Sequence, residues 1–355
     1  MRLAFMNAIR VLVCGGVLFS VILCLSPHGA AGPWDGLSLR WTKATPFPEP
    51  TSDYAAGVLD GKLVIAGGTF WEGSKGHWVK KHYSASTHAF DPITQVWQKL
   101  PDLPTPLAGA ASVEIGNSLL VLGGYTGTKV SRKMYTLAKT LNGYAWIDSG
   151  ALPVDRLFAG ALSVGKQLYL LGGTTRFEPL DPAGSCCASK TAVSSFMVLD
   201  TTHPEQGWSQ LAPLPGPLRA FFSTATDGKS IWIFGGRFQA EPKAPITSFS
   251  LVFRYDILQM RWKAMKPLPE ENPNASPPSP VFVKDKFILI TDVKAIWQLD
   301  LKTLEYRELS PLPENALVDK FVWLKDRIIG AGGENNVEGP RRRSEWTFVG
   351  QFNAQ

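Results

Sequence analysis

Cysteine is scarce in this sequence, with 4 among 355 residues. Cys14 and Cys24 lie in an apolar N-terminal segment, which leaves only the adjacent Cys186 and Cys187 in the rest of the chain. A fold held by several disulfides is therefore excluded. Any disulfide outside the N-terminal segment must join these two neighbours, and we expect it to form in an exported protein.

Charge is sparse as well. Charged residues make up 19% of the chain, the formal net charge is +6, and the longest basic run is Arg341-Arg342-Arg343. Tracking a phosphate backbone needs a clustered basic face, so we expect no nucleic-acid partner. The histidines outside the N-terminal segment show no metal-ligand spacing, and no metal or cofactor is expected.

The chain has one long apolar run, Val11 to Leu25, which follows Arg2 and Arg10. Gly29 and Ala31 fit a cleavage site, and the run is shorter than the roughly 20 residues of a membrane-spanning helix. Residues 1–31 are therefore predicted to be a signal peptide, and residues 32–355 a single exported domain, periplasmic or extracellular, that is not held at a membrane. A membrane anchor and a lipoprotein acylated at Cys24 are the alternatives.

Glycine and proline are plentiful and mark an internal repeat. Six times an aromatic residue stands seven positions before a proline: Trp41/Pro48, Trp97/Pro104, Trp146/Pro153, Trp208/Pro215, Trp262/Pro269 and Tyr306/Pro313. In four copies a Gly-Gly pair begins 26 residues after the aromatic, in a fifth 27, and each pair follows an apolar, β-rich run. The remaining copy has Thr291-Asp292 at this place.

Each copy has room for four short strands. The apolar run before Gly-Gly predicts a buried strand, and a further strand ends at Asp91, Asp200, Asp256 or Asp300. Four-stranded units of roughly 40 to 60 residues are typical of propeller blades, because a single such sheet cannot bury both faces. We therefore predict an all-β, six-bladed propeller. The glycines would let the chain pass close to the next blade.

The two ends of the chain complete the count of blades. The last copy has strands near Val318–Trp323, Arg327–Ala331 and Glu345–Val349, and then the sequence ends. The strand that carries Trp41 lies at the other end of the chain. We predict that Leu37–Thr42 pairs with Glu345–Val349 in antiparallel register and closes the ring, which removes two exposed sheet edges.

The apolar run, the Gly-Gly pair and the spaced aromatic resemble the kelch repeat over residues 37–350. Within that family the sequence is similar to the sialic-acid mutarotase (N-acetylneuraminate epimerase) group and its cyclically permuted branch. The similarity lies in Gly67-Gly68-Thr69-Phe70-Trp71-Glu72 and in Gly332-Gly333-Glu334 followed by Arg341. It implies a catalytic Glu334 and Arg341, with Arg342 or Arg343 as alternatives to Arg341.

The resemblance also implies that ligands bind at one end of the ring, in the loops that follow Gly-Gly and Leu-Pro. Arginine can hold a carboxylate, and aromatic rings can stack on the apolar face of a sugar. The candidate substrate-binding residues are Asp53, Trp71, Glu72, Arg156, Arg219, Arg237, Phe238 and Lys320. Glu334, Arg156, Arg219 and Arg237 are expected to point into one axial pocket.

Three functions fit this arrangement. The first is binding of a small acidic sugar with mutarotase or epimerase activity by general acid/base chemistry. The second is a non-catalytic propeller that binds a carbohydrate or a protein, since fold alone does not decide function. The third is a glycan-processing enzyme of another type. Whether the chain is an enzyme stays open at this point.

Overall fold

A computed structural model describes residues 38–74, 77–177, 191–240, 244–269, 279–284, 287–291, 295–312, 320–335 and 342–353. The predicted signal peptide, Cys186, Cys187 and Arg341 lie outside the described residues. Within them, the one helical element is the 3₁₀ turn η1 (Pro204–Gln206). The chain is therefore all-β, as predicted.

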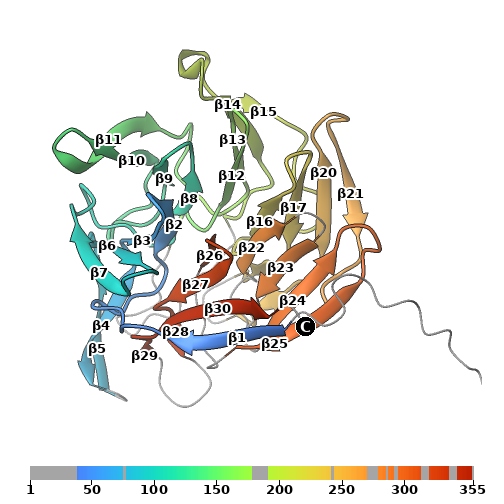
Figure 1. The fold of residues 1–355 in the computed structure, drawn as a ribbon. Helices are drawn as coiled ribbons and strands as arrows, with labels where there is room; N and C mark the ends of the chain where they lie inside the picture. Colours follow the sequence, from blue (N-terminus) through green and yellow to red (C-terminus); the bar gives the residue numbers. More distant parts are fainter. Residues whose placement is uncertain are drawn as a thin grey trace, which may run out of the picture. The chain divides into compact units, whose positions relative to one another are not determined.

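The strands form six four-stranded antiparallel sheets, which are the six blades of a propeller. The first strand of each blade contacts the first strand of the next, in the cyclic order β2, β8, β12, β16, β22, β26 and back to β2. Figure 1 shows these six inner strands around a common centre. The prediction of six blades is confirmed.

The strands of the first three blades have the following bounds. Blade 1 consists of β2 (Ala55–Leu59), β3 (Lys62–Ala66), β6 (Thr87–Asp91) and β7 (Val96–Leu100). Blade 2 consists of β8 (Ala111–Glu114), β9 (Ser118–Leu122), β10 (Lys133–Thr140) and β11 (Gly143–Ala151). Blade 3 consists of β12 (Gly160–Val164), β13 (Gln167–Leu171), β14 (Phe196–Asp200) and β15 (Ser209–Gln210). The predicted buried strands before Gly-Gly are β3, β9 and β13.

The other three blades repeat this pattern. Blade 4 consists of β16 (Ser223–Thr226), β17 (Ser230–Phe234), β20 (Val252–Asp256) and β21 (Arg261–Met265). Blade 5 consists of β22 (Ser279–Lys284), β23 (Phe287–Thr291), β24 (Ala295–Asp300) and β25 (Tyr306–Pro311). Blade 6 consists of β26 (Phe321–Leu324), β27 (Arg327–Ala331), β30 (Thr347–Asn353) and β1 (Ser38–Lys43).

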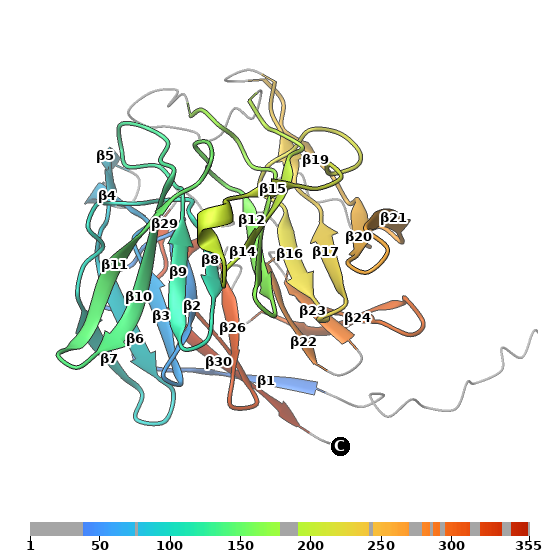
Figure 2. The same ribbon diagram turned by 90° about the horizontal axis from the view of Figure 1, so that it is seen from above.

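Three two-stranded hairpins are inserted next to the blades. They are β4 (Thr69–Ser74) with β5 (His77–Tyr83), β18 (Arg237–Phe238) with β19 (Thr247–Ser248), and β28 (Glu334–Asn335) with β29 (Arg342–Arg343). Each begins directly after a Gly-Gly pair. In Figure 2 the labels of β4, β5, β19 and β29 lie toward the same end of the ring, at the top of the view.

The N-terminal strand closes the ring. β1 pairs with β30 in antiparallel register, from Ser38 opposite Asn353 to Lys43 opposite Phe348. The predicted pairing is thus confirmed, with both strands beginning slightly later than expected. Beyond the strand, the Ala44 N–H donates to Thr347 O at 2.9 Å. Blade 6 is therefore assembled from both ends of the chain (Figure 1).

In five of the six blades the repeated aromatic residue donates a hydrogen bond to the preceding blade. The indole N–H groups of Trp97, Trp146 and Trp262 donate to the main-chain oxygens of Thr45, Pro101 and Ala212 at 3.1, 2.9 and 2.9 Å. Each acceptor lies four residues after the repeated aromatic of the preceding blade. Tyr306 uses its hydroxyl in the same way, donating to Lys266 O at 3.0 Å. The regular spacing in the sequence therefore reflects a contact between blades.

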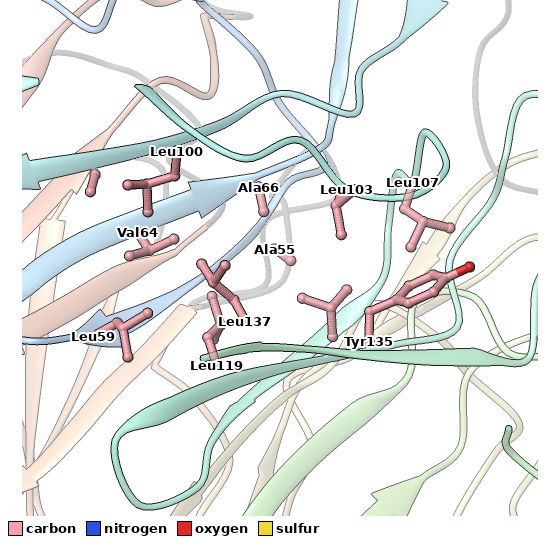
Figure 3. Packing of buried hydrophobic residues seen from close by; sticks show 12 residues of the cluster. Ala55, Leu59, Val64, Ala66, Leu100, Leu103, Leu107, Leu119, Tyr135 and Leu137 are labelled. Carbon is pink, nitrogen blue, oxygen red and sulfur yellow. The ribbon is translucent and has the colours of Figure 1, made fainter. Parts of the chain in front are cut away.

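Apolar side chains fill the space between blades. Between blades 1 and 2, Leu59, Val64 and Leu100 pack against Leu119 and Leu137, as Figure 3 shows. Leu119 and Leu137 are fully buried. Burial of one leucine side chain contributes roughly 1.5 to 3 kcal/mol, so these interfaces stabilise the ring.

The free edge of inner strand β2 is covered by side chains of blade 2. Ser112 Oγ donates to Ala56 O at 2.7 Å and accepts from Ala56 N at 3.2 Å. Glu114 Oε1 accepts from Val58 N at 2.7 Å. These bonds satisfy main-chain groups that no neighbouring strand reaches, which matters because an unpaired buried amide is costly.

The Gly-Gly pairs pass against the loop of the next blade. A Cβ on Gly67, whose φ is 72°, would lie 2.3 Å from Leu107 O, and one on Gly123 would lie 2.3 Å from Arg156 O. At the same place the Gly68 N–H donates to Leu107 O at 2.8 Å. The close approach expected from the sequence is therefore confirmed, and these positions exclude any side chain.

Candidate functional site

Four residues are joined in a chain by three main-chain hydrogen bonds at one end of the propeller. Asp53, Gly109, Phe158 and Phe221 each lie two residues before the inner strand of their blade. The N–H of Gly109 donates to Asp53 O (2.7 Å), that of Phe158 to Gly109 O (2.9 Å) and that of Phe221 to Phe158 O (3.4 Å). We call these four residues the axial collar, and the end of the ring where they lie the axial end.

All four collar residues have left-handed backbones, with φ between 53° and 61°. For residues other than glycine this conformation costs roughly 1 to 2 kcal/mol each, and Asp53, Phe158 and Phe221 all adopt it. Strained positions of this kind gather where a protein holds a functional group in place. The collar therefore marks the candidate site.

The residues that follow Gly-Gly border the collar. Thr69 exchanges two main-chain hydrogen bonds with Ser52, and Arg237 exchanges two with Ala220. Ser52 and Ala220 each directly precede a collar residue. Tyr125 and Thr174 form the equivalent bridges in blades 2 and 3. In blade 6 the Gly333 N–H donates to Thr51 O at 2.8 Å, as Gly68 does to Leu107, and this places Glu334 at the equivalent position. Repeat symmetry thus brings Arg237 and Glu334 to the same end of the ring.

Glu334 belongs to a nearly dehydrated network of charges. It forms an ion pair with Arg343, and the exposed fractions of the two side chains are 13% and 6%. Arg343 also donates from Nε to Thr69 O at 3.0 Å and from Nη2 to Thr69 Oγ1 at 2.7 Å. The Thr69 hydroxyl lies 3.2 Å from Asp53 Oδ2, and Lys81 Nζ lies 3.5 Å from the same oxygen. Blades 1 and 6 are joined by this network.

Asp53 is held as a carboxylate. Its burial alone would raise its pKa, but Lys81, Arg343, the Thr69 hydroxyl and Arg237 together outweigh burial and lower the pKa below the usual 3.8. The charge of Arg237, which comes from blade 4, therefore acts on a carboxylate of blade 1.

The two faces of the β4–β5 hairpin have different roles. Thr69 and Trp71 alternate along β4, opposite Tyr83 and Lys81 of β5, so these four side chains share one face. That face carries the contacts to Asp53, and Lys81 Nζ lies 6.0 Å from the Trp71 ring centroid. Glu72 lies on the other face, where it is 60% exposed and bonded to His82 at 2.9 Å. Of the two residues predicted here, Trp71 faces the site and Glu72 faces away from it.

Aromatic side chains lie next to the charged network. The Arg237 guanidinium covers the Phe221 ring at 3.9 Å, and Phe221 stacks on Phe158 with centroids 3.7 Å apart. Tyr83 contacts Tyr125 with centroids 5.3 Å apart. Burial, with smaller effects of Tyr125 and Asp53, raises the pKa of Tyr83 to about 12, so its phenol stays protonated at neutral pH.

The expectation that Arg156 and Arg219 point into an axial pocket is wrong. They are 3% and 2% exposed and occupy the repeat position of Thr51 and Leu107, which is buried in blades 1 and 2 as well. Arg156 Nη2 donates to Ser195 Oγ at 2.7 Å. Arg219 donates to the main-chain oxygens of Gly235, Pro215 and Pro217 at 3.1, 3.0 and 2.8 Å. Both guanidinium groups hold loops together inside the ring.

Lys320 contacts blade 2, and Phe238 lies on the other face of β18 from Arg237. Lys320 precedes β26 of blade 6, but its Nζ donates to Ser112 of blade 2, at 2.9 Å to Oγ and 3.3 Å to the main-chain oxygen. Burial lowers the pKa of Lys320, and the Glu114 carboxylate partly offsets this. Phe238 follows Arg237 on β18, so its side chain points to the opposite face of that strand.

The sequence reasoning missed Lys81, Phe158 and Phe221, and it gave Arg343 only as an alternative. A finer alignment of the repeats finds two of them, because Asp53, Gly109 and Phe158 all stand five residues after the repeated proline and Phe221 stands six after it. Lys81 follows from the alternation of the β4–β5 hairpin. Arg343 follows from its register opposite Glu334.

No helix within the described ranges is both long enough and apolar enough to cross a bilayer. A family model for the Kelch motif matches residues 50–104, a span that contains all four strands of blade 1.

Several curated proteins are similar to parts of the chain. Kelch-like protein terF of Aspergillus terreus is 24% identical over 277 residues, 70% of this chain and 55% of that protein. Human Kelch-like protein 34 is 28% identical over 243 residues, 66% of this chain and 34% of that protein. N-acetylneuraminate epimerase of Vibrio vulnificus is 40% identical over 78 residues, 21% of this chain and 20% of that protein.

The matched segments thus span about half or less of the length of these relatives. What the motif match and the architecture show together is the fold and one motif: this chain is a six-bladed β-propeller, and its first blade matches the Kelch motif.

Proposed function

We propose that the axial end binds a small acidic sugar, and that the chain is a mutarotase or epimerase of the sialic-acid type. The observation that carries this proposal is the network of Glu334, Arg343 and Asp53 beside the axis, next to Arg237 and a wall of aromatic rings. Cations suit the acid group of such a sugar, and rings suit its apolar face.

Mutarotation needs two proton movements and no cofactor. A base removes the proton of the anomeric hydroxyl, the bond from the anomeric carbon to the ring oxygen breaks, and the ring oxygen takes up a proton. The open-chain ketone then recloses on its other face by the reverse steps. We assign Glu334 the role of the acid/base, which fits the modest demands of such a reaction.

Arg343 acts in this proposal as the group that positions Glu334. Its three guanidinium nitrogens donate to Glu334 Oε1 and to the two oxygens of Thr69, so it fixes the carboxylate relative to blade 1. It replaces Arg341, the first choice from the sequence, which lies outside the described residues. Arg237 and Lys81 are the proposed cations for the substrate's acid group, and Trp71 is part of the wall.

The short match to N-acetylneuraminate epimerase supports an acidic sugar as the ligand. The longer matches to Kelch-like proteins support the alternative, a propeller without catalytic activity that binds a carbohydrate or a protein. Membership of the cyclically permuted branch stays a prediction.

Calorimetric titration separates these possibilities at the first step. N-acetylneuraminic acid should bind, and N-acetylglucosamine, a neutral sugar of similar polarity, should bind at least about ten-fold more weakly, the factor expected for one charged hydrogen bond. If neither sugar binds, the sugar proposal fails and a protein partner takes its place. If the acid binds without faster equilibration of its anomers, the chain is a carbohydrate-binding module.

We also propose that the chain is exported and that Cys186 and Cys187 are joined in the exported protein. Both features lie outside the described residues. Mass spectrometry of protein isolated from its producing cells tests both features. The expected species begins at residue 32, and neither of its cysteines can be alkylated. An intact N-terminus or two alkylated cysteines would reject the corresponding part.

A further inference from the structure

Arg237 lies at the top of a column of stacked groups at the axial end. Its guanidinium carbon is 3.9 Å from the centroid of the Phe221 ring. Phe221 in turn stacks on Phe158, with an angle of 28° between the rings. A Cβ built on Gly109 would lie 2.4 Å from Cε1 of Phe158, so the Phe158 ring occupies the space that the glycine leaves. The column therefore rests on the collar itself.

The backbone holds this column in place. Phe158 and Phe221 have φ values of 53° and 57°, and the Phe221 N–H donates to Phe158 O at 3.4 Å. Left-handed backbones of bulky residues persist only where the surroundings enforce them. Gly109, the collar residue without a side chain, gives the second ring its space. Three successive blades thus contribute to the position of one guanidinium group.

A stacked guanidinium is oriented as well as placed. When one face of the plane lies on a ring, the N–H groups point outward within that plane, which is the geometry that two oxygens of a carboxylate can match. Lysine has no such plane.

Resting on the proposed function, we propose that Arg237 is the receptor for the carboxylate of the sugar, and that Phe221 and Phe158 are positioning residues that hold its plane for this contact. Arg343 has a different task, because its nitrogens are engaged with Thr69 and Glu334. The site then separates recognition of the acid group, in blade 4, from proton transfer, in blade 6.

The test compares N-acetylneuraminic acid with its methyl ester, which keeps the sugar and removes the charge. Wild-type protein should bind the acid at least about ten-fold more tightly than the ester. Phe221→Leu should bring this ratio close to one and leave the affinity for the ester unchanged. Phe221→Tyr, which keeps the ring, should retain the wild-type ratio, and Arg237→Lys should lose it.

Two further measurements guard against loss of the fold. Thermal unfolding of each variant shows whether it is folded at the titration temperature. Phe158→Leu removes the lower ring but keeps the ring under Arg237, and it should reduce the ratio only in part. A merely structural role for the rings would weaken binding of acid and ester alike and leave the ratio unchanged.

The outcomes separate the two proposals. If wild-type protein binds neither compound, the proposed function fails. If it binds the acid preferentially and folded Phe221→Leu keeps that preference, the acid-sugar function stands and the role of the column is overturned. Equal binding of acid and ester by wild-type protein would overturn Arg237 as the carboxylate receptor.

Discussion

Trp262 donates its indole N–H to the main-chain oxygen of Ala212 at 2.9 Å and so connects blade 4 to blade 3. Trp262→Phe keeps an aromatic side chain and removes the donor, leaving the Ala212 oxygen without this partner. We expect a loss of about 1 kcal/mol in the free energy of unfolding, measured by urea denaturation. Leu141→Ala, at an exposed site, is the control and should change little. A Trp262→Phe protein as stable as wild type would show that the spacing has another cause.

Deletion of residues 32–45 should destabilise the whole ring. It removes β1, its pairing with β30 and the buried Leu39 side chain. Lost burial and lost hydrogen bonds together should cost about 5 kcal/mol or more. Deletion of residues 32–37, which leaves β1 intact, is the matched control. Equal unfolding midpoints for the two truncated proteins would contradict closure by the N-terminal strand.

His88 should make the fold less stable in mild acid. Burial, helped by Lys99 and opposed by Glu49 and Asp102, lowers the pKa of His88 below 6.5. The unfolded state therefore binds this proton more readily, and stability falls as the pH drops below 6.5 toward the lower pKa of the folded state. The His88 ring packs edge-on against Phe47, next to the closing strand.

We expect His88→Gln to reduce the difference in unfolding free energy between pH 7.5 and pH 5.5, conditions chosen to bracket the reference histidine pKa of about 6.5. His203→Gln, at a histidine whose side chain is 58% exposed, is the control and should keep the wild-type difference. Identical pH dependence in wild type and His88→Gln would refute the assignment.

Arg219→Met tests the structural role of the buried arginine. Three main-chain oxygens would lose their donor, and we expect a loss of about 3 kcal/mol or more in the free energy of unfolding. Affinity for N-acetylneuraminic acid should be unchanged at a temperature where the variant is folded. Arg40→Met, at an exposed site, is the control. Weaker sugar binding with unchanged stability would restore Arg219 to the ligand site.

Much of the fold could be predicted because the repeat has a physical cause at each position. The Gly-Gly pairs avoid a clash with the next blade. The repeated aromatic residue donates a hydrogen bond to the preceding blade, so both features recur with nearly fixed spacing. The insertion in blade 5 and the absence of its glycines did not hide that blade, since Tyr306 keeps the bond between blades.

Side-chain direction could not be predicted in the same way. Trp71 and Glu72 are neighbours in the sequence and face opposite sides of one hairpin. Arg219 was predicted to bind the ligand because it follows a Leu-Pro turn. Its side chain is instead buried and donates to main-chain oxygens. The pairing of Glu334 with Arg343 depends on hairpin register, which the basic run alone leaves open among its three arginines.

The most direct test of the proposed function is the rate at which freshly dissolved N-acetylneuraminic acid reaches its anomeric equilibrium, followed by one-dimensional NMR. Wild-type protein should accelerate equilibration, and Glu334→Gln should lose the acceleration by about 100-fold or more while keeping its affinity for the sugar. Glu345→Gln, at an exposed carboxylate of the same blade, should behave as wild type. Equal acceleration by Glu334→Gln and wild type would contradict the role of Glu334, and no acceleration by wild type above the protein-free rate would contradict catalysis altogether.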